Sequence, residues 1–461
     1  MTLIKSISGI RGTIGGIRGE NLTPFDIVEC TAAYAQIIKE KNVPQKVVVG
    51  RDGRMTGEIV NALVVSTLVS MGLDVVDLDF STTPTVEIAV PAEKAGAGII
   101  LTASHNPKEW NALKFLDEKG EFISPETGEK VLKYIEKQKA EFAALESIGN
   151  YEKNENYIDI HIEKILDLPY IDADKIKKKK FKVVVDCINS TGVISIVPLL
   201  KLLGCEVISI NDNLTGDFAH NPEPLPENLV ELADMVKEQK ADLGIAVDPD
   251  VDRLAFVCEN GEMFGEEYTL VAAADYILGK KPGNTVSNLS SSRALEDVTN
   301  RYYGQYFSSK VGEVNVVAKM KEVDAVIGGE GNGGVILPDL HYGRDSLIGT
   351  VLILALLAER DISLCELRKT YPDYTISKNK IQLTKETDPD KIILSLIAKY
   401  EDEKINVEDG LKIDFENGWV QLRKSNTEPI MRVYAESTSE EKAMEFAKMI
   451  IDDVEDIIKD L

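Results

Sequence analysis

One local plan occurs three times along this chain: an apolar strand, a polar loop, a helical stretch, a turn and a second apolar strand. It starts at Lys46 (KVVVGRDGRMTG), at Lys182 (KVVVDCINSTG) and, more faintly, at Asn284 (NTVSNLSSSRAL). Strand, helix and strand in series predict βαβ units, whose strands form a mostly parallel sheet. Three copies indicate three related α/β domains in tandem. The alternative is a chance likeness between generic βαβ units.

The pattern changes after about Tyr371. IQLTKE, LKIDFE and WVQLRK alternate apolar and polar residues, as half-exposed antiparallel strands do. An amphipathic helical stretch then runs from Glu440 to the C-terminus. We therefore predict an α/β protein of four domains: three related α/β domains with mixed sheets, at residues 1–150, 151–255 and 256–370, and an α+β domain at residues 371–461.

Composition narrows the class of protein. The formal net charge of −25 argues against a nucleic-acid partner and against anionic membranes, although solubility alone also explains acidity. The five cysteines are widely spaced with no C-x-x-C pair, which suits a reducing cytosol. The N-terminus lacks the apolar core of a signal peptide, and the apolar run at residues 351–358 is too short to span a bilayer. We expect a cytoplasmic, soluble protein.

The stretch DPDVDRL joins two apolar segments, LGIAV and LAFV, and carries Asp248, Asp250 and Asp252. Carboxylates at i, i+2 and i+4 of an extended chain project to one side, so three hard oxygen donors converge as a Mg²⁺ site requires. An EF-hand is excluded because Arg253 stands where that loop needs glycine. A solvated acidic turn is the alternative.

The stretch ILTASHNP places Ser104 and His105 at the end of a buried strand. Neighbouring residues of an extended chain point apart, and the G-x-S-x-G elbow of hydrolases is absent, so a hydrolase dyad is not indicated. A serine that carries a phosphoryl group needs a cation to neutralise the phosphate oxygens, and the aspartate loop offers one. Lys114 is a candidate proton carrier if a nearby cation or burial lowers its pKa. A plain loop is the alternative.

Two further loops offer ligand-binding groups. GGEGNGG lets a ligand approach the backbone, while Glu330 and Asn332 can hydrogen-bond to sugar hydroxyls or to an amine, with a flexible hairpin as the alternative. RKSNTEPIMR is typical of an anion cradle, or else of an ordinary loop with surface arginines. Its candidate donors are Arg423, Ser425, Asn426, Thr427 and Arg432. Arginines in or beside expected loops can together make a positive cleft in an acidic protein: Arg11, Arg51, Arg253, Arg344, Arg423 and Arg432.

TASHNP, DPDVDR, GEGNGG and RKSNTEP, in this order, resemble the phosphoserine, Mg²⁺, sugar and phosphate loops of the α-D-phosphohexomutase superfamily, which includes phosphoglucosamine mutases, phosphomannomutases and phosphoglucomutases. The likeness extends from SGIRG near the N-terminus to the last domain. It implies four domains around a central cleft. It also implies that phosphorylated Ser104 interconverts hexose 1-phosphate and hexose 6-phosphate through a bound hexose 1,6-bisphosphate, which also serves as activator.

The same resemblance implies a role for each site residue. Mg²⁺ would be held by Asp248, Asp250, Asp252 and an oxygen of phosphorylated Ser104. Arg253, His105 and Lys114 would assist proton transfer and charge stabilisation, and Arg11 would contact the reacting group. The sugar hydroxyls would be held by Glu330 and Asn332, and the non-reacting phosphate by Arg423, Ser425, Asn426, Thr427 and Arg432.

Substrate preference is less constrained by the sequence. The sugar loop ends in Asn332-Gly333-Gly334, without the Ser-Gly-His of many bacterial members, and is more like archaeal-type enzymes. Glu313, where the family often sets its preference, can pair with a 2-ammonium group or accept from a neutral hydroxyl, so glucosamine phosphate is only slightly favoured over mannose and glucose phosphates. A bisphosphate-forming or phosphatase-like enzyme and a silent phosphosugar-binding protein are the other readings. Either a monomer or a homodimer is expected.

Overall fold

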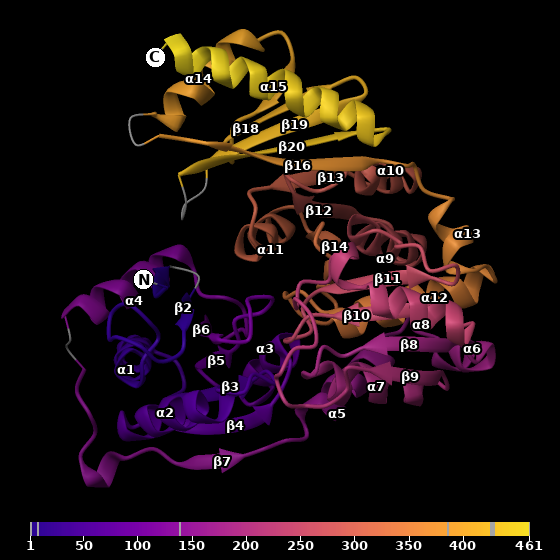
Figure 1. Ribbon diagram of the computed structural model, residues 1–461. Coiled ribbons are helices and arrows are strands. Elements are labelled where there is room, and N and C mark those ends of the chain that lie inside the picture. Colours follow the sequence, from indigo (N-terminus) through magenta and orange to yellow (C-terminus); the bar gives the residue numbers. More distant parts are fainter. Residues whose placement is uncertain (1, 7–8, 138–139, 385–386, 425–428, 461) are drawn as a thin grey trace. The chain divides into compact units, whose positions relative to one another are not determined.

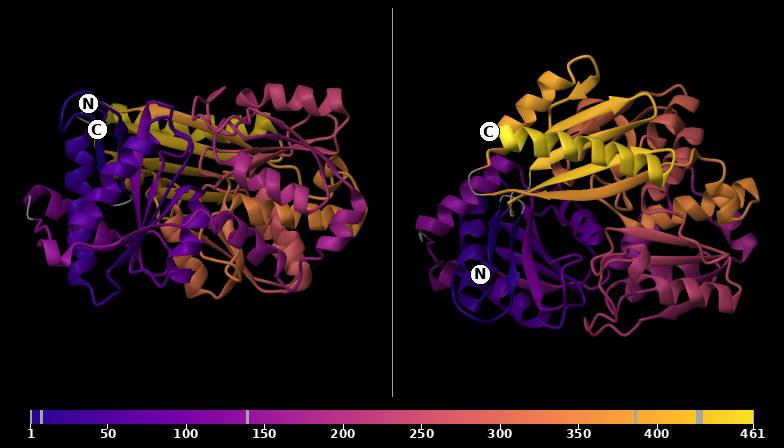
Figure 2. Two further views of the ribbon diagram at one scale, coloured as in Figure 1. Left: turned by 90° about the horizontal axis from the view of Figure 1, so that it is seen from below. Right: turned by 45° about the horizontal axis from the view of Figure 1, so that its top comes forward.

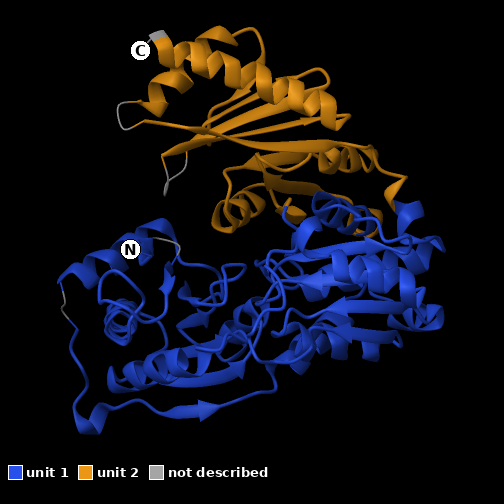
Figure 3. Ribbon diagram, in the orientation of Figure 1, with its two compact units in different colours: residues 1–276, 332–367 blue, residues 277–331, 368–461 orange. Residues whose placement is uncertain are grey.

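The computed structural model describes residues 2–6, 9–137, 140–384, 387–424 and 429–460. The chain divides into two compact units (Figure 3). Unit 1 comprises residues 1–276 and 332–367, and unit 2 comprises residues 277–331 and 368–461. No helix among the described residues is long and apolar enough to cross a membrane.

The first part of unit 1 is a seven-stranded mixed sheet (Figure 1). Its strands, in order across the sheet, are β1 (Ile4–Ser6), β2 (Gly9–Thr13), β6 (Trp110–Leu116), β5 (Ala97–Leu101), β3 (Lys46–Arg51), β4 (Asp74–Phe80) and β7 (Tyr151–Lys153). β3 runs parallel to β4 and β5, whereas β6 pairs antiparallel with β5 and β2. The first predicted βαβ unit is confirmed.

Helices cover both faces of this sheet. Alternate residues of β3 enter two separate cores, Val47 and Val49 in one and Val48 in the other, which is why its centre is a continuous run of valines. The helices of the first core are α1 (Pro24–Glu40), α2 (Gly57–Ser70) and α4 (Pro125–Lys137). Those of the second are α3 (Thr83–Ala92) and α5 (Tyr157–Leu166).

The second part of unit 1 repeats the plan with four strands. Across the sheet they are β11 (Leu254–Cys258), β10 (Leu243–Val247), β8 (Lys182–Asp186) and β9 (Glu206–Ile210), all parallel except β11. The other elements that begin in unit 1 are the 3₁₀ turns η1 (Leu145–Ser147) and η2 (Pro226–Asn228), helices α6 (Ala173–Lys179), α7 (Gly192–Leu202), α8 (Val230–Gln239), α9 (Glu266–Lys280), α12 (Ser346–Arg360) and α13 (Leu364–Arg368), and strand β15 (Gly334–Ile336). The second predicted βαβ unit is thus β8-α7-β9.

Unit 2 contains the third copy and the antiparallel domain. In the third copy, β12 (Asn284–Asn288) lies parallel to β13 (Tyr306–Ser309) and to β14 (Ala325–Glu330), with helices α10 (Ala294–Arg301) and α11 (Glu313–Glu322). β14 continues through the first glycines of GGEGNGG, so Glu330 ends a strand instead of lying within a loop.

The second sheet of unit 2 has five strands. It is antiparallel, as the alternation of apolar and polar residues after Tyr371 predicts. They are β16 (Thr375–Gln382), β20 (Ile430–Ser437), β19 (Gly418–Lys424), β18 (Leu411–Phe415) and β17 (Lys404–Asn406). One face packs its apolar residues against α14 (Pro389–Lys399) and α15 (Glu440–Asp460). Figure 2 shows the long yellow helix α15 lying along this sheet.

Candidate active site

The serine loop joins β5 to β6 in unit 1. Ser104 is buried, and its φ of +49° places it in the left-handed region that few non-glycine residues adopt. Its backbone N–H donates to Thr102 Oγ1 at 2.9 Å, and that hydroxyl donates to Asp52 Oδ2 at 2.6 Å. The loop is therefore held in a strained conformation by buried hydrogen bonds, as occurs at functional sites.

Arg54 organises the same loop, although no motif in the sequence assigns it to the site. Its side chain is fully buried and makes a 3.1 Å ion pair with Asp52. Its guanidinium also donates to four backbone carbonyls of the serine loop, those of Ser104 at 2.6 Å, Asn106 at 2.7 Å, Pro107 at 2.7 Å and Trp110 at 2.8 Å. The only sequence signal for it is an arginine in the loop of the first βαβ unit, where Arg51 looked equivalent.

The aspartate loop joins β10 to β11, as predicted. Asp248, Asp250 and Asp252 are all fully buried, and one carboxylate oxygen from each lies within 4.8 Å of the others. The predicted reason for this convergence was wrong, however. The segment is a turn in which Val251 has a φ of +61°, so the backbone folds around the three carboxylates instead of extending past them.

The serine loop and the aspartate loop meet inside unit 1. The Ser104 hydroxyl donates to Asp248 Oδ2 at 2.8 Å across a separation of 144 residues. Lys114 Nζ donates to Asp250 Oδ2 at 3.0 Å, and the Thr83 hydroxyl donates to the same oxygen at 2.6 Å. The structure therefore brings the proposed phosphoryl carrier, the proposed metal ligands and the proposed proton carrier into one cluster.

The aspartate loop has the properties of an oxygen-donor metal site. Arg344 Nη2 contacts Asp252 Oδ2 at 2.5 Å, but Asp250 Oδ1 and Asp252 Oδ1 are buried without a hydrogen-bond partner among the described residues. Burial and repulsion from the other two aspartates raise the pKa of Asp248 well above its usual range. Because buried carboxylate oxygens are costly when unpaired, these residues fit a small hard cation such as Mg²⁺.

His105 lies closer to the serine than predicted. Because Ser104 is left-handed, the two neighbouring side chains turn toward each other, and His105 Nδ1 is 3.3 Å from Ser104 Oγ. Burial, reinforced by the positive charge of Arg253, lowers the pKa of His105 to about 3. The imidazole is therefore neutral at pH 7.

Lys114 departs from its expected state. Burial opposes its charge, but Asp250 and Asp252 outweigh that effect and raise the pKa of Lys114. The condition set for a neutral proton acceptor, a lowered pKa, is not met, and the side chain is a positive charge against the aspartates.

The other predicted arginines of unit 1 are Arg11, Arg51 and Arg253. Arg253 makes a 3.0 Å ion pair with Glu223, and the exposed Arg11 lies on β2, next to β6. Arg51 makes a 2.6 Å ion pair with Asp79, away from the serine loop. Arg51 ends β3, and it is Arg54, in the loop that follows, that contacts the serine loop.

The sugar-loop residues are split between the two units. In unit 2, Glu330 Oε1 accepts hydrogen bonds from Asn288 Nδ2 at 2.9 Å and from the backbone N–H of Gly312 at 3.0 Å. Gly312 caps α11, whose first residue is the buried Glu313, so Glu330, predicted to hold sugar hydroxyls, lies beside the residue predicted to set substrate preference. Asn332 belongs to unit 1, where its Oδ1 accepts from the N–H of Gly334 at 3.3 Å.

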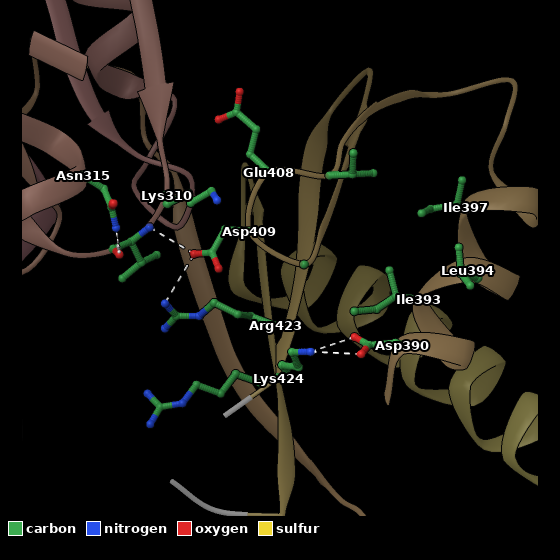
Figure 4. Close-up of a pocket in the computed structure, with 14 residues that line it drawn as sticks. Lys310, Asn315, Asp390, Ile393, Leu394, Ile397, Glu408, Asp409, Arg423 and Lys424 are labelled. Carbon is green, nitrogen blue, oxygen red and sulfur yellow. Dashed lines mark hydrogen bonds and ion pairs between the residues drawn. The ribbon is translucent and has the colours of Figure 1, made fainter. Parts of the chain in front are cut away.

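The two predicted phosphate-binding arginines lie together in unit 2. Arg423 and Arg432 are paired opposite each other on β19 and β20, and both line a cavity of about 750 Å³ (Figure 4). Asp409 Oδ2 lies 3.5 Å from Arg423 Nη1 and accepts from the N–H of Val311 at 3.0 Å. Three predicted members of the cradle lie outside the described residues: Ser425, Asn426 and Thr427.

Comparison with known proteins agrees with the fold and identifies the family. The four domain models of the phosphoglucomutase/phosphomannomutase family match in order: α/β/α domain I at residues 4–142, α/β/α domain II at 157–261, α/β/α domain III at 265–374, and the C-terminal domain at 384–453. The chain therefore belongs to this family and is a phosphohexomutase, an isomerase that transfers phosphate intramolecularly.

Individual relatives carry more than one name. The chain is 35% identical to a probable phosphoglucosamine mutase of Methanopyrus kandleri, covering 98% of both chains, and 36% identical to a phosphoglucomutase/phosphomannomutase of Thermococcus kodakarensis, covering 97% of this chain and 99% of the relative. A solved phosphoglucomutase/phosphomannomutase family protein from Burkholderia thailandensis is 27% identical with a TM-score of 0.86, covering 99% of this chain and 97% of that one.

Proposed function

We propose that this enzyme interconverts hexose 1-phosphate and hexose 6-phosphate through phosphorylated Ser104, with glucosamine phosphate as the preferred substrate. The observation that carries the assignment of Ser104 is its 2.8 Å hydrogen bond to Asp248, beside carboxylate oxygens that have no other described partner. A serine held against a cation site is placed to carry a phosphoryl group, because phosphoryl transfer depends mainly on positioning and charge neutralisation.

Asp248, Asp250 and Asp252 would hold Mg²⁺ together with an oxygen of phosphorylated Ser104. Bound there, the ion would neutralise charge on the phosphoryl oxygens during transfer. Arg54 fixes the backbone of the serine loop, and Thr83 and Lys114 fix the position of Asp250.

In the transfer step, the bond between phosphorus and Ser104 Oγ breaks as a bond to a sugar oxygen forms, and the sugar hydroxyl loses its proton. His105 stays the predicted acceptor of that proton, although so low a pKa makes it a weak base, and Lys114, Arg253 and Arg11 supply positive charge. The resulting hexose 1,6-bisphosphate returns its other phosphate to Ser104, so the serine is phosphorylated again at the end of each cycle.

The phosphate of the substrate that does not react is assigned to the two arginines of unit 2. Arg423 and Arg432 face one cavity, which supports a role in gripping the phosphate that does not react. Ser425, Asn426 and Thr427 stay predictions for the same cradle, and Glu330 and Asn332 stay predictions for the sugar hydroxyls.

Preference for glucosamine phosphate rests on Glu313. A buried carboxylate at the start of α11 can pair with a 2-ammonium group, which glucose and mannose phosphates lack. Mannose and glucose phosphates are the alternative substrates, and relatives named for each activity have almost the same identity to this chain.

The carrier role is tested with Ser104→Ala. We expect turnover to be abolished while a hexose 6-phosphate still binds in calorimetry within about fivefold of the wild-type Kd, since the serine oxygen is only one of many contacts. Retained turnover would exclude Ser104 as carrier. Net release of inorganic phosphate by the wild type would favour the phosphatase-like alternative, and wild-type binding without turnover would favour a silent binder.

Substrate preference is tested by kcat/KM on the phosphates of glucosamine, glucose and mannose, with Mg²⁺ and phosphorylated enzyme. A buried group that reads the amine should give a preference of ~100-fold or more, and Glu313→Gln should reduce it. Equal values for glucose and mannose with poor use of glucosamine would make the enzyme a general phosphohexomutase. A cytoplasmic location and a monomeric or homodimeric state stay predictions.

A further inference from the structure

Unit 1 holds a second buried cluster of ionisable side chains, separate from the aspartate loop. His161 on α5 and Asp345 at the N-cap of α12 are wholly buried, and His341, four residues before Asp345, has a side chain only 10% exposed. His161 Nε2 lies 2.9 Å and His341 Nε2 lies 3.2 Å from the same oxygen, Asp345 Oδ2. The chain has four histidines, so half of them meet at one carboxylate.

The other nitrogen of each ring also faces an oxygen. His161 Nδ1 lies 2.9 Å from Thr85 Oγ1, at hydrogen-bond distance, and His341 Nδ1 lies 3.2 Å from Oε2 of the buried Glu87 in an ion-pair contact without hydrogen-bond geometry. Metal-ligating histidines characteristically have their second ring nitrogen fixed by a carboxylate, hydroxyl or carbonyl, which sets the tautomer and the ring orientation. Both rings therefore present Nε2 to one carboxylate oxygen, with a second oxygen beside the opposite nitrogen.

We propose that His161 Nε2, His341 Nε2 and Asp345 Oδ2 form a binding site for one divalent transition metal of the zinc class. Three ligand atoms of the cluster lie within 4.8 Å of one another. Neighbouring ligands of a tetrahedral zinc ion, with bonds of about 2.0–2.1 Å, are themselves about 3.3 Å apart, close to the observed distances. When a divalent cation displaces the proton of His341 and both imidazoles bind it, its two positive charges balance the negative charges of Asp345 and Glu87 inside the protein.

The donor set selects the class of ion. Two imidazole nitrogens and a carboxylate suit zinc, cobalt or nickel, whereas Mg²⁺ prefers oxygen donors only. The cluster is thereby distinct in chemistry from the three aspartates, and the two sites can be titrated separately in one protein.

A metal here would join segments that also contact the aspartate loop. Helix α3, which carries Thr85 and Glu87, begins with Thr83, whose hydroxyl donates to Asp250. The first residue of α12, Ser346, donates its N–H to the carbonyl of Val251 at 3.2 Å. A bound metal would therefore link α3 and α12, the two helices whose first residues contact the aspartate loop, without touching substrate.

The test is metal binding by the full-length protein after chelator treatment, with saturating Mg²⁺ present to occupy the aspartate loop. We expect one equivalent of Zn²⁺ to be withdrawn from a chromophoric chelator, and one equivalent of Co²⁺ to give the visible absorption of a site with imidazole ligands. His341→Gln and His161→Gln should each weaken Zn²⁺ binding at least ~100-fold, because loss of a ligand exceeds the 10–100-fold effect of its outer partners.

His220→Gln is the matched control, because it removes a histidine of unit 1 that pairs with Asp186 instead. It should bind Zn²⁺ as the wild type does. The proposal is overturned if the wild type binds no Zn²⁺ under these conditions, or if both cluster variants bind it normally. His161, His341, Asp345 and Glu87 would then form only a buried ion network. His341→Gln, at the more exposed ring, keeps the test valid if His161→Gln does not fold.

Discussion

Arg54 offers the sharpest test of how the serine loop is held. Its guanidinium makes five hydrogen bonds, four to carbonyls of the loop and one to Asp52, all from a wholly buried side chain. Arg54→Lys keeps the positive charge beside Asp52, but an ammonium group has only three donors and no planar fork. At least two of the five acceptors therefore lose their partner.

The expected cost follows from that count. A buried polar group left unsatisfied costs about 1–3 kcal/mol, so Arg54→Lys should lower the free energy of unfolding by about 2–6 kcal/mol. Ser104 should also lose its fixed position against Asp248, and a displacement of about 1 Å at a reacting group can cost roughly 100-fold in rate. We therefore expect kcat to fall about 100-fold with KM changed by less than about threefold.

The assay is a coupled mutase measurement at saturating Mg²⁺, with urea unfolding of the same preparations. Arg51→Lys is the matched control: Arg51 lies three residues earlier, at the end of β3, and pairs with Asp79 instead of the serine loop, so kcat of this variant should stay within about threefold of the wild type. If Arg54→Lys turned over at the wild-type rate, the carbonyl bonds would not be what positions Ser104.

Asp252→Asn should raise the Mg²⁺ concentration for half-maximal activity at least about tenfold, since one carboxylate of the site loses its charge; an unchanged Mg²⁺ dependence in the mutase assay would exclude it as a ligand. Asp409→Asn should lower KM up to about fivefold with kcat unchanged, because a partly exposed carboxylate at 3.5 Å competes with phosphate for Arg423; a higher KM would contradict this. In zinc-free protein, burial lowers the pKa of His341, but its contacts with Asp345 and Glu87 outweigh burial and raise that pKa to about 10, above the ordinary value of 6.5. The charged imidazole therefore stabilises the folded protein fully below pH 6.5, and this stabilisation is lost as pH rises toward 10. Urea unfolding at pH 7–9 measures this loss. The free energy of unfolding of the wild type should fall with pH more steeply than that of His341→Gln, by up to about 1.4 kcal/mol per pH unit. Equal slopes for the two proteins would refute the prediction.

Much of the site was readable because its groups are local in sequence. The aspartates fall within one turn between two apolar strands, and Ser104 follows another such strand, so strand periodicity alone places both loops at sheet ends. The details of side-chain direction were not readable. Left-handed residues at Ser104 and Val251 reverse the expected directions, and neither residue type predicts that conformation.

The state of each ionisable group was likewise decided by its neighbours. Lys114 was expected to be a neutral proton carrier if its pKa fell, but contact with Asp250 keeps it charged. Only the fold brings these two residues together, since they are separated by 136 positions in the chain.

The sequence by itself determined the class of each domain, the order of the four motifs and the chemistry that each motif offers, because periodicity, turn residues and ligand types are properties of short segments. Tertiary structure alone decided which distant groups meet: Arg54 with the carbonyl of Ser104, 50 residues away, and His161 with Asp345, 184 residues away. The physical reason is that a buried polar side chain finds its hydrogen-bond partner on whichever distant segment packs against it, and no local sequence pattern encodes that partner.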